Sequence, residues 1–189
     1  MKAVWVNFCL ALAVTLAVTV SPLVVAQTTE APRFEDYHVA VWSGTVAPLK
    51  LRSHGLARLY KTLIRQQLRE EGVNFAGHYT LASVGCGTGC STTAIVDARS
   101  GRAYFPNELD GWTSIVGDYD IPEGEDIRTF HAESRLLKAI GRPTIGKPSD
   151  ERHGPSGIYF YQWINNRLRP VKFIPVGSYP DVDPPNSNH

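Results

Sequence analysis

The sequence predicts an α+β fold that is mainly antiparallel β, with one long N-terminal helix packed on a β-sheet meander. An apolar repeat of helical spacing lies between Ser53 and Gly72. Short apolar runs bounded by turn residues follow from Asn74 onward, which is typical of strands. The chain also has 16 glycines and 13 prolines, as expected for short strands joined by turns.

Residues 53–72 give the clearest helical signal. Ser53 is a suitable N-cap, and Gly72 stands where a helix terminator is expected. The residues that recur at helical spacing are Leu56, Leu59, Tyr60, Leu63, Ile64, Gln67 and Leu68. We expect this helix to cover one face of a sheet.

Three strands are predicted after the helix, over residues 75–84, 92–97 and 102–105. The last two are expected to form a hairpin, because residues 98–101 end in Gly101 and suit a type I turn closed by a left-handed glycine. At the entry to the first strand, Asn74 is expected to satisfy backbone groups, and Gly77 to mark a close backbone approach.

A second hairpin is predicted near the C-terminus, from residues 158–163 and 168–174. Asn165 and Asn166 can adopt the positive φ of a tight turn, and Pro170 places the last strand at a sheet edge. Residues 127–140 fit either a helix or a hairpin. We expect a hairpin, because the neighbouring segments have the pattern of antiparallel strands.

The N-terminal 26 residues have the order of a secretory signal peptide. Lys2 is followed by an apolar run, and Val24-Val25-Ala26 provides small residues for cleavage. The alternative is a membrane anchor, since the apolar run approaches the length of a spanning helix. We expect cleavage before Gln27 and a periplasmic or secreted product with no stable membrane anchor. Residues 27–36 are then a flexible leader, 37–177 one globular domain and 178–189 a disordered tail.

Composition limits the classes of function. Cleavage removes Lys2 from the 19 basic residues, which leaves 18 basic against 18 acidic residues in a mature chain of 163. A neutral chain without basic clusters argues against nucleic acid and against anionic membrane surfaces. A length of 163 residues is enough for a single domain with a real core.

The mature chain has two cysteines, Cys86 and Cys90, which lie in the run GCGTGC. In an extended strand their Cα atoms would be roughly 13 Å apart, whereas a disulfide needs less than about 7 Å. The intervening glycines permit the necessary turn. Because exported proteins fold in an oxidising compartment, we expect a Cys86–Cys90 disulfide that clamps a tight loop.

Three other interpretations of the cysteines are weaker. A metal site would need two more ligands, and the loop has only His78 nearby. A redox pair would have two intervening residues instead of three. A nucleophile, Cys86 or Cys90, could have His78 as its base and Asp97 as the orienting group. The acidic residues at 118–126 depart from a calcium loop, so no metal and no cofactor are expected.

The clamped loop is the candidate binding site, formed by Gly85, Gly87, Thr88 and Gly89 with His78 beside it. Successive backbone N–H groups in such a loop can bind an anion. No phosphate-binding or hydrolase motif is present in the sequence.

The combination of NFAGHY, GCGTGC, IVDARSGRAYFP and a final YFYQW…RLRPVKF hairpin resembles small exported bacterial proteins of unassigned activity. The resemblance covers about residues 56–174 and implies a shared β-rich fold without a known site. From the residues themselves we expect a binding or inhibitor module that presents the clamped loop to a protein partner in the cell envelope. The alternative is an envelope hydrolase or transferase that uses a Cys/His pair.

Overall fold

The computed structural model describes residues 30–87, 90–114, 126–145 and 153–176. Apart from Glu30, these residues belong to one compact unit that begins at Ala31. The predicted signal peptide and C-terminal tail lie outside the described residues, as do Thr88 and Gly89. No helix among the described residues has the length and apolar character needed to cross a membrane.

The first antiparallel sheet has four strands. Three strands follow the order β1 (Tyr79–Gly87), β2 (Cys90–Asp97) and β3 (Ala103–Tyr104). The fourth strand, β4 (Trp112–Thr113), pairs with the beginning of β2, whereas β3 pairs near its end. Strand β2 is buried from Thr92 to Val96, a stretch that includes its apolar run Ala94-Ile95-Val96. Strand β1 is therefore an edge of this sheet.

The second antiparallel sheet has the order β5 (Arg128–Phe130), β6 (Leu136–Gly141), β7 (Gly157–Ile164), β8 (Arg167–Pro175). Strands β5 and β6 confirm the expected hairpin over residues 127–140.

The turn between β7 and β8 also agrees with the sequence. Asn165 and Asn166 have φ values of 51° and 59°, as a tight hairpin turn requires. Pro170 lies in the edge strand β8 and pairs with Tyr161, next to a register shift in which Val171 of β8 is skipped.

The expectation of one long N-terminal helix on a single meander is wrong. The protein is mostly antiparallel sheet, divided between two sheets, with two short α-helices, α1 (Gly55–Leu59) and α2 (Lys61–Glu71). Tyr60 separates the helices because its backbone leaves the helical region, with φ −98° and ψ 19°.

The apolar repeat that predicted a long helix is only partly buried. Ile64 and Leu68 face the core, whereas Leu59 and Leu63 are 69% and 46% exposed. The predicted N-cap is also replaced: the His54 imidazole accepts the hydrogen bond from the Leu56 N–H. Apolar spacing alone could not distinguish one continuous helix from two short ones.

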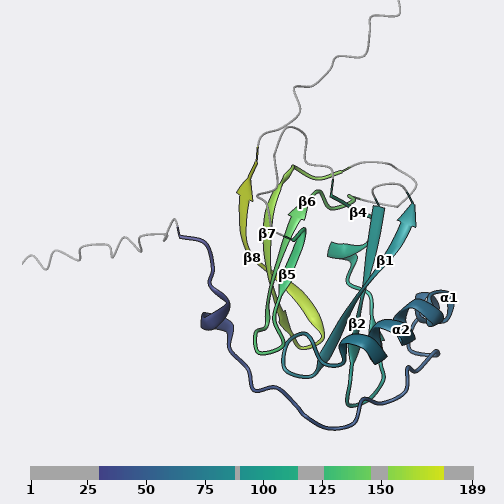
Figure 1. Cartoon of the computed structure of the whole chain (residues 1–189). Helices are drawn as coiled ribbons and strands as arrows, with labels where there is room; N and C mark the ends of the chain where they lie inside the picture. Colours follow the sequence, from purple (N-terminus) through teal and green to yellow (C-terminus); the bar gives the residue numbers. More distant parts are fainter. Residues whose placement is uncertain (1–29, 88–89, 115–125, 146–152, 177–189) are drawn as a thin grey trace, which may run out of the picture. The chain divides into compact units, whose positions relative to one another are not determined.

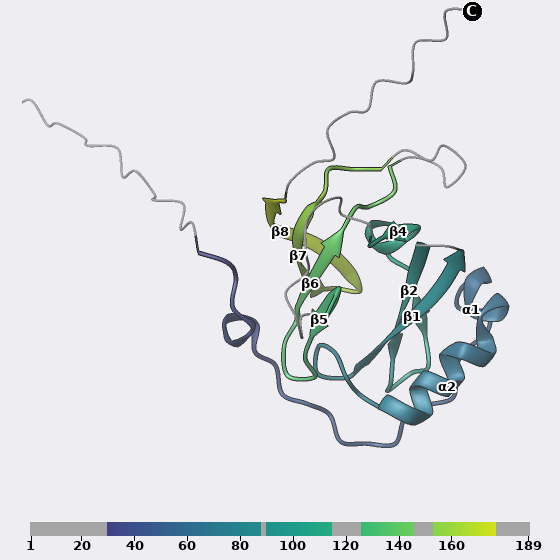
Figure 2. The same cartoon turned by 45° about the horizontal axis from the view of Figure 1, so that its top comes forward.

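The elements form three layers (Figures 1 and 2). The two sheets pack face to face, and their shared core includes Leu81, Ile95, Leu137 and Trp163. The opposite face of β1 and β2 packs against the helices through a second cluster that contains Ile64 and Leu68. Successive residues of β1 thus point alternately into the two cores, as expected for a strand that is covered on both faces.

The segment before α1 runs along the outside of these layers (Figure 1). It contains a short 3-10 helix, Phe34–Tyr37, and a second 3-10 helix, Asn107–Leu109, follows β3. Backbone hydrogen bonds attach the segment at several points, including Trp42 to Gly77 and Lys50 to Gly101. Gly77 has φ +83°, and a Cβ there would meet the carbonyl of Ala40, which confirms the close approach expected of this glycine.

Candidate functional site

A disulfide joins Cys86 to Cys90 at the end of the β1–β2 hairpin, as the sequence predicts. The Cα atoms are 5.2 Å apart. This approach is possible because the register shifts between Gly85 and Gly87, so that Gly87 pairs directly with Cys90. Gly87 has φ +144°, a conformation that favours glycine. Of the candidate binding loop, Gly85 and Gly87 are described, and both are exposed.

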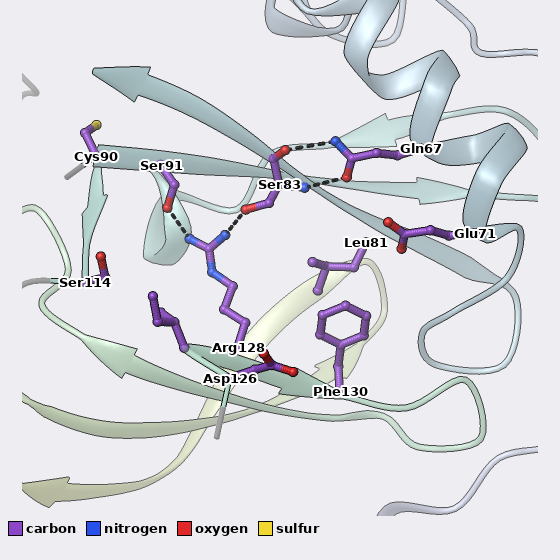
Figure 3. Close-up of a pocket in the computed structure, with 11 residues that line it drawn as sticks. Gln67, Glu71, Leu81, Ser83, Cys90, Ser91, Ser114, Asp126, Arg128 and Phe130 are labelled. Atoms are coloured by element: carbon purple, nitrogen blue, oxygen red, sulfur yellow. Dashed lines mark hydrogen bonds between the residues drawn. The ribbon is translucent and has the colours of Figure 1, made fainter. Parts of the chain in front are cut away.

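A cavity of about 480 Å³ adjoins the clamped end of this hairpin. Figure 3 shows that its walls come from the three layers: helix α2, strands β1 and β2, and strand β5. Leu81, Ile127 and Phe130 supply apolar surface, and Cys90 brings the disulfide to the wall. The cavity is thus a site between the sheets, with the covalent clamp as part of its rim.

Arg128 supplies the positive charge in this cavity. Its guanidinium lies between two hydroxyls of the first sheet, and it donates to Ser83 Oγ and to Ser91 Oγ, the latter at 2.7 Å (Figure 3). The Nε atom is buried and has no hydrogen-bond partner. Among the described residues, no carboxylate lies within ion-pair distance of the guanidinium.

Burial lowers the pKa of Arg128 from 12.5 to about 10. The cause is desolvation, which disfavours the charged form of a base. At neutral pH the group is still a cation, because the lowered pKa remains well above 7. A partly buried cation that bonds only to hydroxyls is stabilised by any anion that reaches it.

Helix α2 fixes one of the two hydroxyls. The Gln67 carboxamide donates to the Ser83 carbonyl at 2.9 Å and accepts from the Ser83 N–H at 3.0 Å. Two acidic residues, Glu71 and Asp126, line the cavity and are exposed. A ligand that enters therefore meets carboxylates near the mouth and the Arg128 cation against the first sheet.

The structure separates the residues of the alternative catalytic site. His78 and Asp97 lie at one end of the β1–β2 ladder, where Tyr79 pairs with Asp97. Cys86 lies near the opposite end of β1, about 26 Å away along a strand. Burial lowers the pKa of His78, with a further contribution from Arg99. His78 is therefore placed beside Asp97, but remote from Cys86 and from the clamped loop.

Sequence reasoning missed Arg128 because its partners, Ser83 and Ser91, lie on two strands of the other sheet. The one local signal is an arginine between Ile127 and Thr129 in a short strand that borders the core. The structure describes no group of three metal-ligating side chains. No family model, curated protein or solved structure matches this chain.

Proposed function

We propose that the protein is an exported binding module, and not an enzyme, that holds a carboxylate of its ligand in the Arg128 cavity. The observation that carries the proposal is the Arg128 guanidinium, which is partly buried, bonded to two serines and unpaired with any described carboxylate. Its unused N–H groups suit the two oxygens of a carboxylate.

The other walls define the rest of the ligand. Leu81 and Phe130 offer apolar contact beside the cation, so an acid with an apolar or aromatic body fits better than a small inorganic anion. The Cys86–Cys90 clamp stiffens the rim, which reduces the ordering cost of binding. A protein partner in the envelope could supply this group as a C-terminal apolar residue, and a free organic acid has the same chemistry.

Two matched peptides test the carboxylate. Acetyl-Ala-Ala-Phe with a free C-terminus is titrated into the protein by calorimetry, beside the same peptide with a C-terminal amide. We expect the free acid to bind at least about 10-fold more tightly, since hydrogen bonds to charged groups contribute about 1.5–3 kcal/mol. Equal affinities would contradict the proposal. Phenylacetate, titrated in parallel, distinguishes a small acid from a peptide terminus as the preferred source.

Variants then locate the site. Arg128→Lys keeps the charge but loses the planar fork, and Ser91→Ala removes one of the groups that orient it. Both are expected to weaken binding of the free acid, while Arg65→Gln, on the exposed face of α2, leaves it unchanged. Far-ultraviolet circular dichroism confirms that each variant is folded. Unaltered binding by the folded Ser91→Ala and Arg128→Lys proteins would exclude the cavity.

Export is tested separately. The proposal requires removal of the signal peptide and release of a product that begins at Gln27. Expression of the full chain in a Gram-negative host, cell fractionation and N-terminal sequencing measure this directly. Recovery of an uncleaved chain in the membrane fraction would favour the anchor alternative.

A further inference from the structure

A second concave surface lies away from the Arg128 cavity and shares no residue with it. It consists of two adjoining hollows of about 770 and 450 Å³. The segment before α1, strand β3 and the β7–β8 turn form its walls. Ser53, Arg102 and Tyr104 line both hollows, so they make one continuous groove.

The groove gathers positive charge that is dispersed along the sequence. Its basic residues are Lys50, Arg52, Arg102, Arg167 and Arg169, and all five are exposed. Among the described residues that line the groove, Glu108 is the only acidic one. None of the five cations forms an ion pair with another described residue. This surface could not be predicted from the sequence, because no two of the three segments that form it are adjacent along the chain.

Aromatic rings lie between these charges. The Arg102 guanidinium lies 5.7 Å from the centre of the Tyr104 ring. The His54 ring stacks on Phe105 with their centres 4.6 Å apart. Planar rings beside cations are suited to a ligand that has both flat apolar faces and anionic groups.

Hydrogen bonds hold the groove in shape. The Ser53 hydroxyl donates to the Lys50 carbonyl at 2.6 Å and accepts from the Ala103 N–H at 3.1 Å. On the opposite wall, the Tyr79 hydroxyl donates to Asn166 Oδ1 at 2.8 Å and fixes the turn beside Arg167. Both walls are therefore held in place before a ligand binds. Binding to such a groove costs less conformational entropy than binding to a mobile cluster of lysines and arginines.

We propose that this groove binds an acidic oligosaccharide, a chain of sugar rings that carry carboxylates. A single small anion would contact only part of a surface whose cations are distributed over two hollows. Sugar rings have apolar faces that pack on aromatic side chains, and their carboxylates suit arginine. Nucleic acid is less suitable, because the whole chain has a formal net charge of only +1.

Titration with defined probes tests the ligand class. A galacturonate hexamer is the anionic probe, maltohexaose is the neutral control, and a single-stranded DNA oligonucleotide represents the other class of polyanion. We expect binding of the galacturonate hexamer that weakens as salt concentration rises, and no measurable binding of maltohexaose. Tighter binding of the DNA at the same salt concentration would overturn the assignment, as would no binding of the hexamer.

Charge-matched variants locate the binding surface. Arg102→Gln with Arg167→Gln removes one cation from each side of the groove and is expected to weaken hexamer binding about 10-fold or more. Arg58→Gln with Arg65→Gln removes the same charge from the exposed faces of α1 and α2 and should have little effect. Equal losses in the two double variants would show a general charge effect and contradict a groove. The Arg128→Lys variant should bind the hexamer normally, which separates this site from the carboxylate cavity.

Discussion

The Gln67 side chain pairs with both backbone polar groups of Ser83, as a neighbouring strand would. Its amide nitrogen donates to the Ser83 carbonyl at 2.9 Å, and its amide oxygen accepts from the Ser83 N–H at 3.0 Å. Asn74 makes the same arrangement with Leu81, which lies two residues before Ser83 on β1. The Asn74 Oδ1 accepts from the Leu81 N–H at 2.7 Å, and its Nδ2 donates to the Leu81 carbonyl at 3.3 Å.

These two amides cover the exposed edge of the first sheet. Strand β1 is an edge strand, and alternate residues of such a strand direct their N–H and C=O groups away from the sheet. Leu81 and Ser83 are two such residues. Gln67 and Asn74 thus satisfy backbone groups that would otherwise be available to another chain, which confirms the role expected of Asn74.

Removal of this edge cover is expected to destabilise the protein. Gln67→Ala loses two hydrogen bonds to the backbone of Ser83 and should lower the free energy of unfolding by about 1–3 kcal/mol, measured by urea denaturation. Gln66→Ala is the matched control, because Gln66 bonds only to Glu70 on the exposed face of α2. A Gln67→Ala protein as stable as the control would show that the edge pairing contributes nothing.

The same change should expose the edge to self-association. Gln67→Ala combined with Asn74→Ala leaves the edge groups of both Ser83 and Leu81 unpaired. We expect this double variant to form soluble oligomers at high protein concentration, detected by analytical ultracentrifugation, at conditions where the Gln66→Ala protein keeps its wild-type sedimentation. Identical sedimentation of the two proteins would argue against a protective role.

The disulfide should protect the shape of the hairpin end more than the stability of the whole fold. A ring as small as that closed by Cys86 and Cys90 contributes about 2 kcal/mol on the loop-entropy model. The Cys86→Ser, Cys90→Ser double variant is expected to lose about that much stability by urea denaturation. Before reduction the mature wild-type protein, which lacks Cys9, should take up no alkylating group, and after reduction it should take up two at Cys86 and Cys90, measured by intact mass. Alkylation without reductant would contradict the bridge.

Gly141 is predicted to tolerate no side chain. It has φ +145°, and a Cβ there would lie 2.3 Å from both the Thr113 carbonyl and the Trp112 indole nitrogen. The indole is buried and donates to the Ile140 carbonyl at 3.1 Å, so neither neighbour can move freely. Gly141→Ala should therefore cost about 3 kcal/mol or more in the free energy of unfolding.

Gly55 provides the control for that substitution. It begins α1, and a Cβ built there meets no atom within 4 Å. Gly55→Ala should leave the stability unchanged or raise it by about 0.4–1 kcal/mol. A Gly141→Ala protein with the stability of Gly55→Ala would mean that strand β6 and the Trp112 segment separate easily, contrary to their close packing.

The features predicted correctly from the sequence are those that depend on nearby residues. The Asn165-Asn166 turn and the Cys86–Cys90 bridge follow from residue type and short spacing, because the responsible physics is the φ preference of a few residues and the reach of a short loop. The boundary at Tyr60 was not predictable in this way. It depends on which apolar side chains find a partner in the sheets, and Leu59 and Leu63 do not.

The candidate sites required the tertiary fold. Ser83, Ser91 and Arg128 are brought together only when β5 of one sheet faces β1 and β2 of the other. Likewise, Arg102 and Arg167 share a groove only because β3 and the β7–β8 turn border the same hollow. The near-zero net charge of the chain is a correct average, but it gave no information about the clustering of basic residues in the groove.

His78 should make stability sensitive to mild acid. Burial, with help from Arg99, lowers its pKa in the folded protein below the usual 6.5, while Asp97 opposes the shift. Between the lowered pKa and 6.5 the unfolded chain binds more protons than the folded one, so stability falls as the pH falls through this window. His78→Gln removes that linkage. We expect a smaller loss of unfolding free energy between pH 7.5 and 5 than in the wild type, measured by urea denaturation, whereas His153→Gln on an exposed segment should follow the wild-type curve. If His78→Gln and wild type lost stability in parallel, the histidine would be as readily protonated in the fold as in the unfolded chain.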